Sequence, residues 1–288
     1  MSKSKMVKAI IQNAVIITAI ESKDIVNKAI KTHGLSPVGA IALGRALTMV
    51  ALMSDDLKNT KDRLSATIDG DGPLGLMNVC VNGKGQVKAT IENPLVEGQT
   101  RADGTLDVGQ AVGKTGALRV IKDLGMKQNY CGTTRLVSGE IAQDFAYYYA
   151  ESEQQPCGIT LGVGLDNKKC KSAGGVMLKV MPNCPSDLLF DLETVMYAMD
   201  EMSYQFENST AEQVIMRFFS EYNPVFVEEK EIEYKCNCSK RNMDKIVKKV
   251  GKAECYQILE EMGFLEIVCH FCNKRYVYHK EDLDKLFE

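Results

Sequence analysis

Two short cysteine motifs, Cys236-Asn-Cys238 and Cys269-His-Phe-Cys272, decide how the last part of the chain folds. Each motif holds two thiols close together, and thirty residues separate the two motifs. Four sulfurs at this spacing predict a tetrahedral site, a geometry that zinc accepts without an electronic preference. Because four protein ligands leave no open coordination position, hydrolytic zinc catalysis is disfavoured. We therefore predict one structural Zn²⁺ bound by all four cysteines, and we expect no enzymatic activity.

The segment around this site, residues 234–288, is of a size at which a hydrophobic core alone stabilises a fold only marginally. Structural zinc contributes an apparent binding free energy on the order of 10–16 kcal/mol, which becomes folding free energy. Zinc-held thiolates remain nucleophiles toward oxidants, and each motif can close into a disulfide once one sulfur becomes sulfenic acid. Oxidation would then consume the ligands, release zinc and unfold the segment, so these four residues encode a physical switch.

The rest of the sequence indicates that these thiols lie in a reducing compartment of the cell. The most apolar stretch, 38–53, carries Arg45 and is too short to cross a bilayer. The N-terminus resembles a secretion signal, but Gln12 and Asn13 interrupt its apolar part and no small-residue cleavage site follows. We therefore predict a cytoplasmic protein without a membrane span. In such proteins, clustered cysteines bind metal or sense redox state more often than they form static disulfides.

The charged residues divide the chain into three regions. Residues 182–233 hold twelve acidic and only two basic side chains, whereas 1–181 and 234–288 each carry a small excess of positive charge. These breaks predict a core domain at 1–181, a linker at 182–233 and a zinc-binding domain at 234–288. The whole chain has a net charge of only −3, which argues against a strongly basic nucleic-acid-binding protein.

The first region predicts an α+β fold, because its strands, hairpins and helices follow one another without a regular βαβ repeat. Ser36 and Pro37 open a helix through Met53 that is apolar nearly all round and is expected to be buried. Asn82-Gly83 predicts the turn of a hairpin. The remaining expected elements are strands at 10–20, 64–68, 77–81, 87–91, 159–165 and 176–181, and helices at 24–32 and 140–153.

The middle region predicts two amphipathic helices rich in Met and Phe and acidic on the outside. Ser186 is the expected N-cap of the first helix, and Ser209 with Glu212 the expected capping box of the second. We expect the apolar stripes to pack on the first region in the resting protein. Methionine is typical of adaptable binding surfaces, so the same stripes would become an adhesive surface when released. The apolar positions are Leu188, Leu192, Val195, Met196, Met199, Met202, Phe206, Val214, Ile215, Phe218, Phe219 and Tyr222.

Several other patterns are better explained by structure than by chemistry. The segment 70–75, GDGPLG, matches a dinucleotide-binding fingerprint, but Pro73 lacks an N–H and a hairpin rather than a helix follows, so we predict a tight turn. Ser138 has no catalytic frame around it and is expected to cap a helix. The three histidines show no metal-binding spacing. The six cysteines outside the motifs are each expected to be small buried hydrophobes: Cys80, Cys131, Cys157, Cys170, Cys184 and Cys255.

With these motifs in view, the whole chain resembles the redox-regulated molecular chaperone family heat shock protein 33. The resemblance rests first on the two cysteine motifs and their separation. Other stretches also resemble the family: Gly70-Asp-Gly-Pro-Leu-Gly75, Gly104-Thr-Leu-Asp-Val108, Lys122-Asp-Leu-Gly125, Ser138-Gly-Glu-Ile-Ala142, Asp144-Phe-Ala-Tyr-Tyr148 and Ser152-Glu-Gln154.

The resemblance implies an ATP-independent holdase that is inactive when it is reduced and zinc-bound. It implies that oxidation joins Cys236 to Cys238 and Cys269 to Cys272, that zinc then leaves, and that the zinc module and the linker unfold. It further implies an active homodimer that holds unfolding or oxidatively damaged client proteins. The six other cysteines depart from the family pattern and leave open a part for further thiol chemistry.

Two other classes of function remain open. A zinc-ribbon nucleic-acid-binding protein would explain the basic run of Lys240, Arg241, Lys245, Lys248 and Lys249, although a solvated helix face is the commoner cause of such a run. No nucleic-acid partner is expected, because the zinc thiolates offset the small positive charge of this region. A thiol–disulfide oxidoreductase is the enzymatic alternative, although the CxxC motif follows a strand-like run instead of opening a helix.

Overall fold

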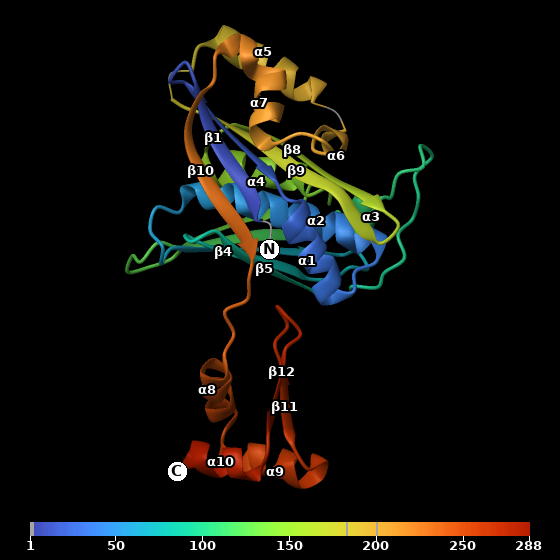
Figure 1. Ribbon diagram of the computed structural model, residues 1–288, viewed down its shortest axis with the longest axis vertical. Helices are drawn as coiled ribbons and strands as arrows, with labels where there is room; N and C mark the ends of the chain where they lie inside the picture. Colours follow the sequence, from blue (N-terminus) through green and yellow to red (C-terminus); the bar gives the residue numbers. More distant parts are fainter. Residues whose placement is uncertain (1–2, 183, 200) are drawn as a thin grey trace. The chain divides into compact units, whose positions relative to one another are not determined.

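The computed structural model describes residues 3–182, 184–199 and 201–288 (Figure 1). It divides into two compact units, Met1–Lys235 and Cys236–Glu288. The acidic middle region therefore belongs to the first unit in this structure. The predicted division into a core domain at 1–181, a linker at 182–233 and a zinc-binding domain at 234–288 stays a prediction.

The first unit is built on a ten-stranded sheet with the strand order β7-β6-β3-β4-β5-β10-β1-β2-β9-β8. Every neighbouring pair is antiparallel except β5 and β10, which pair in parallel over two residues. This topology confirms the predicted α+β class. The strands are β1 (Ser4–Ile11), β2 (Val15–Glu21), β3 (Arg63–Gly70), β4 (Met77–Asn82), β5 (Gln86–Ile91), β6 (Gly116–Asp123), β7 (Tyr130–Arg135), β8 (Cys157–Asp166), β9 (Lys169–Val180) and β10 (Val225–Tyr234).

Helix α2 (Pro37–Met53) is the centre of the main core. Ser36 caps it by accepting a hydrogen bond from the Gly39 N–H, with Pro37 in the first turn, as predicted. The helix contacts β3, β4 and β5 from one half of the sheet order and β2, β9 and β8 from the other, so the sheet curves around it (Figure 1). Together with the following turn it is long and apolar enough to cross a membrane, but 83% of its apolar window is buried inside the protein, as in a core helix.

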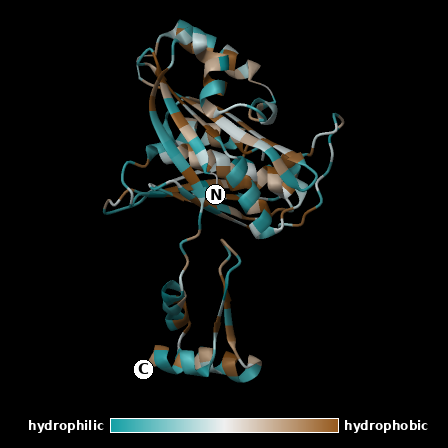
Figure 2. Cartoon of the chain, viewed as in Figure 1, coloured by the Kyte–Doolittle hydropathy of each residue, from teal (hydrophilic) through white to brown (hydrophobic). Residues whose placement is uncertain are grey.

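The other face of β1, β2 and β9 carries a second core, which is covered by the middle region. Three helices form this cover: α5 (Ser186–Ala198), α6 (Met202–Gln205) and α7 (Ala211–Phe219). Hydrophobic and hydrophilic residues mix along α5 and α7, as expected for amphipathic helices (Figure 2). Leu192, Phe206 and Phe219 are buried against the sheet, which confirms that the apolar stripes pack on the first region.

Further helical segments complete the first unit: α1 (Lys23–His33), η1 (Ser54–Asp56), α3 (Val108–Val112), α4 (Ala142–Tyr148), η2 (Tyr149–Glu153) and η3 (Ser220–Tyr222). Asp56, in η1, forms ion pairs with Lys179 at 2.6 Å and Lys122 at 3.3 Å. Burial would raise the pKa of Asp56, but these two ammonium groups outweigh it and hold the pKa below its ordinary value. The pairs therefore connect η1 to β6 and β9, the second strand from each end of the sheet order.

Several predicted elements differ from the structure. The strand expected at 10–20 is a hairpin, because Gln12 and Asn13 take positive φ angles of 48° and 54° and reverse the chain. The helix expected from Glu140 begins at Ala142. Ser138 is not its N-cap, because the Asp144 carboxylate accepts the backbone N–H groups of four preceding residues and holds them in a turn.

The middle region also differs in detail from the prediction. The N-cap of α5 is Pro185, and the capping box of α7 is formed by Thr210 and Gln213, one residue after the expected pair. Residues 225–234 form β10, a strand that takes up the end of the segment 182–233 predicted as a helical linker. Strand β10 has one buried residue, Ile232, and two adjacent glutamates, Glu228 and Glu229, interrupt any alternation, so periodicity gave no signal for a strand.

Candidate metal centre

The second unit supplies all four predicted ligands from two loops. Its elements are α8 (Lys240–Val250), α9 (Lys252–Met262), β11 (Leu265–Val268), β12 (Arg275–Tyr278) and α10 (Lys280–Phe287). Cys236 and Cys238 lie just before α8, whose N-cap Ser239 accepts the Asn242 N–H. Cys269 and Cys272 lie in the turn between β11 and β12.

Backbone hydrogen bonds shape the turn that holds the second cysteine pair. The Cys269 carbonyl accepts the N–H groups of Cys272 at 3.2 Å and Asn273 at 2.7 Å. Asn273 takes a positive φ of 55°, which asparagine tolerates better than most residues. The Cys269 N–H then closes the turn onto the Lys274 carbonyl at 3.0 Å. The hairpin thereby directs two thiols to one side of the turn.

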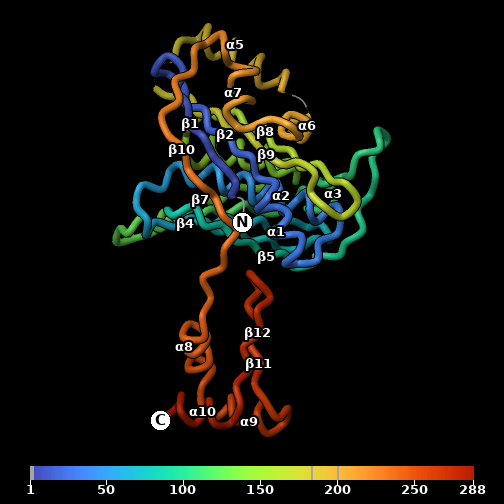
Figure 3. The backbone as a smooth tube through the Cα atoms, in the orientation of Figure 1, coloured from blue at the N-terminus to red at the C-terminus, as the bar shows by residue number. Residues whose placement is uncertain are grey.

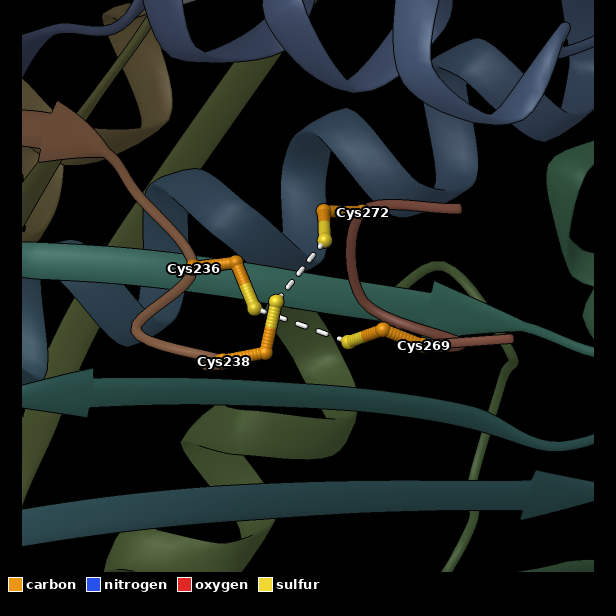
Figure 4. Close-up of side chains that lie close together, drawn as sticks. All are labelled: Cys236, Cys238, Cys269 and Cys272. Carbon is orange, nitrogen blue, oxygen red and sulfur yellow. Dashed lines mark hydrogen bonds between the residues drawn. The ribbon is translucent and has the colours of Figure 1, made fainter. Parts of the chain in front are cut away.

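The four thiols converge on one point (Figure 4). All four Sγ atoms lie within 4.8 Å of one another. The Cys236 and Cys269 sulfurs are 3.7 Å apart, and those of Cys238 and Cys272 are 3.4 Å apart. Zn–S bonds of about 2.3 Å in a tetrahedron place sulfurs about 3.8 Å apart, so the arrangement fits a zinc ion. No other group of metal-binding side chains comes together in the described ranges of the chain.

Hydrogen bonds to the sulfurs set their acidity. Burial would raise the pKa of Cys238, but hydrogen bonds from the Tyr276 hydroxyl and from neighbouring thiols outweigh it and lower the pKa to about 7. Burial raises the pKa of Cys236 and of Cys272, while backbone N–H groups act in the opposite direction. The site therefore favours one thiolate first, and a bound metal would deprotonate the others.

Tyr276 is the residue that the sequence analysis missed. Its hydroxyl donates to the Cys238 Sγ at 3.1 Å from β12. Partners of this kind orient metal ligands and tune their basicity. The sequence carries no signal for this contact, because it depends on the pairing of Tyr276 with Ile267 across the β11–β12 hairpin.

The core of the second unit is small. Its fully or nearly buried side chains are Met243, Val247, Cys255, Leu265, Cys269, Tyr276, Tyr278 and Leu283, and the other three cluster cysteines pack against them. The ligands are therefore part of the core itself. This arrangement supports the prediction that a bound metal stabilises the fold of this unit.

The six other cysteines lie apart from the cluster and are free thiols. Cys170 and Cys255 are buried, and burial raises the pKa of both thiols, as predicted for small core residues. Cys131 is exposed on β7, so the prediction that it is buried was wrong. Strand β7 is at one edge of the sheet and pairs with a single neighbouring strand, β6, so its residues are less covered than those of a central strand.

The basic run of the second unit follows helix α8. Five side chains of the run, from Lys240 to Lys249, are exposed, and Met243 and Val247 face the core. Lys240 also pairs with Asp282 at 2.7 Å. The run is therefore the solvated face of an amphipathic helix.

The fold and the cluster define a protein with an α+β unit followed by a small unit organised around a four-cysteine centre that could hold a metal ion. The chain belongs to the Hsp33 family, because the family model described as "Hsp33 protein" matches residues 4–279. This membership confirms the resemblance and supports a chaperone function.

Individual relatives match the chain over nearly its whole length. Proteins named 33 kDa chaperonin from Alkaliphilus oremlandii and Alkaliphilus metalliredigens are each 38% identical, covering 95% and 99% of this chain and 92% and 99% of their own. The crystal structure of the 33 kDa chaperonin (heat shock protein 33 homolog) from Thermotoga maritima superposes with a TM-score of 0.92 at 31% identity, covering 99% of this chain and 98% of that one.

Proposed function

We propose that this protein is a redox-regulated, ATP-independent holdase of the cytoplasm that binds unfolding or oxidatively damaged proteins and prevents their aggregation. The observation that carries the proposal is the second core. One face of β1, β2 and β9 carries a cluster of buried apolar side chains that α5–α7 cover, and the same chain connects these helices through β10 to the four-cysteine unit. A surface of this kind binds exposed apolar segments of other proteins once it is uncovered.

In the resting state, Cys236, Cys238, Cys269 and Cys272 hold one Zn²⁺. When bound, the ion neutralises the thiolates and supplies binding free energy that the small core lacks. Tyr276 keeps the Cys238 sulfur oriented toward the other three through its hydroxyl group. The Sγ distances, the all-sulfur donor set and the size of the core support this assignment.

Oxidation acts on the same sulfurs. A thiolate attacks a peroxide and becomes a sulfenic acid, and a second thiol displaces water from it to form the disulfide. Each disulfide thus removes two electrons and two protons from two thiols and reduces one peroxide to two waters. We assign the disulfides to Cys236–Cys238 and Cys269–Cys272, since short chain spacing keeps each pair together after the unit loosens. Two disulfides leave no thiolate to hold the metal.

Loss of the cluster removes the main stabilising element of residues 236–288. The unit then unfolds, and the disorder spreads back through β10, which connects α5–α7 to the four-cysteine unit. The helices α5–α7 then leave the sheet. The exposed face binds client proteins through apolar contacts that require no nucleotide. Two such faces favour association, so the active form is a homodimer.

The decisive experiment measures zinc release, disulfide formation and client protection together. Reduced, zinc-loaded protein is treated with hydrogen peroxide at an elevated temperature, and aggregation of heat-unfolded citrate synthase is followed by light scattering without nucleotide. We expect zinc release to precede protection, with peptide mapping showing the two assigned disulfides. Protection by the reduced, zinc-loaded form at the same level, or zinc release without protection, contradicts the proposal.

A further inference from the structure

Strand β10 occupies the middle of the large sheet although it is the last strand of the first unit. It lies between β1 and β5 and joins the two halves of the sheet (Figure 3). It pairs with β1 over seven register positions from Ser4–Ile232 to Ile10–Val225, but with β5 over only two. If β10 left, β1 would lose one of its two neighbours and present a free edge inside the sheet.

The two ends of β10 are held unequally. At its start, Val225, Phe226 and Val227 are 62%, 41% and 50% exposed. At its end, Ile232 is fully buried, and the Tyr234 hydroxyl lies 3.0 Å from the His33 Nε2 atom. The anchored end of β10, at Ile232 and Tyr234, thus lies just before Cys236, the first cluster cysteine. Disorder that begins at the cluster reaches the anchored end of β10 first.

Backbone hydrogen bonds define which side of β10 faces each neighbour. The Glu233 N–H donates to the Gly85 carbonyl at 2.9 Å, and the Lys235 N–H donates to the Val87 carbonyl at 2.8 Å, so these two amides face β5. Successive residues of a strand direct their amides to opposite sides. The amides of Lys230 and Ile232 therefore face β1, where they lie opposite Met6 and Ser4.

The side chains of the pair are complementary in charge. Lys3 pairs with Glu231, and Lys5 pairs with Glu229 at 2.9 Å. Both carboxylates lie on one face of β10, two residues apart, while Ile232 enters the main core from the other face. The edge of β1 therefore recognises an extended segment with acidic residues on one face and an apolar residue on the other.

From this placement we infer that the β1 edge, once β10 has left it, is a second client-binding site that takes an extended segment of an unfolding protein as an added antiparallel strand. The inference rests on the proposed function and adds main-chain recognition to the apolar face. Unfolding proteins expose unpaired extended backbone, and strand addition is a general mode of peptide binding. The occupant has the chemistry of β10 itself: acidic residues on one face, as at Glu229 and Glu231, and an apolar residue on the other, as at Ile232.

The test uses peptides with the sequence of residues 225–234 and the full-length oxidised protein. One peptide is unmodified, one is N-methylated at Lys230 and Ile232, and the matched control is N-methylated at Glu229 and Glu231. Binding is measured by fluorescence anisotropy of a labelled peptide, and by competition against heat-unfolded citrate synthase. We expect the first and third peptides to bind and compete. The second should bind about tenfold more weakly, because two main-chain hydrogen bonds are lost.

Equal binding of the two methylated peptides overturns the inference, because it shows recognition by side chains alone. Client protection that no peptide reduces also overturns it, while the proposed function stands. If the oxidised protein protects no client, the proposed function fails, and the direct peptide titration still decides whether the β1 edge is a binding site. If the unmodified peptide separates dimers without displacing client, a second copy of the chain is the occupant and the inference is wrong.

Discussion

Replacing Phe219 with alanine should activate the protein without any oxidant. Phe219 is the last residue of α7, is fully buried in the second core and contacts that core as one of its largest side chains. Removing a buried phenylalanine ring costs about 3–5 kcal/mol. At least about 3 kcal/mol of this cost destabilises the state in which α5–α7 are packed on β1, β2 and β9. The population of the state in which these helices have left the sheet should then rise roughly a hundredfold.

The assay compares reduced, zinc-loaded Phe219→Ala with Phe190→Ala as a matched control. Phe190 lies on α5 of the same cover but is 69% exposed, so its loss should change the packing little. We expect Phe219→Ala to suppress citrate synthase aggregation without peroxide and to show faster hydrogen exchange in α5–α7 and on β2. The control should remain inactive until oxidised. Zinc content, measured for both, should be unchanged.

Two results would refute the reasoning. If Phe219→Ala stays inactive although hydrogen exchange shows the cover detached, the face of β1, β2 and β9 is not a client-binding surface. If both phenylalanine variants protect clients equally without oxidant, activity does not depend on packing at the second core.

Three further predictions concern the metal centre and the ion pairs of the first unit. Cys269→Ser should weaken zinc binding by more than about tenfold and expose residues 236–288 to proteolysis, whereas Cys131→Ser should do neither; chelator competition and limited proteolysis measure both effects. Tyr276→Phe should lower the zinc affinity about tenfold in the same competition assay, because it removes the hydrogen bond to the Cys238 sulfur. The control is Tyr278→Phe, which should change the affinity less, because the Tyr278 hydroxyl donates to Asp244 and not to a thiol. The lowered pKa of Asp56 means that its ion pairs stabilise the first unit above about pH 4 and that this contribution is lost as the pH falls through the folded-state pKa. Asp56→Asn should therefore cost about 3–5 kcal/mol at pH 7 and less at pH 3, as measured by urea unfolding at the two pH values; an equal loss at both would show that the pairs contribute nothing.

The sequence predicted those features that depend on neighbouring residues. The helix from Pro37 to Met53 follows from its Ser-Pro start and its continuous apolar run. The hairpin around Asn82-Gly83 follows from its turn residues. The four-cysteine cluster follows from the spacing within each motif, because two short loops can bring two pairs of thiols together in many folds.

Other features depend on contacts between distant parts of the chain. The Asp144 carboxylate takes four backbone N–H groups and delays the start of α4, an outcome that local propensity does not anticipate. Tyr276 reaches Cys238 only through the β11–β12 register. In both cases a side chain acts on atoms that the local pattern does not place nearby.

The amino-acid sequence by itself determined the class of fold, the acidic amphipathic character of the middle region and the set of cysteine ligands. Each of these features depends on composition or on spacing over a few residues. Only the tertiary structure decided that an acidic segment without a hydrophobic face becomes β10 between β1 and β5. A strand is stabilised by hydrogen bonds and side-chain pairs with its neighbours, and those neighbours lie more than a hundred residues away along the sequence.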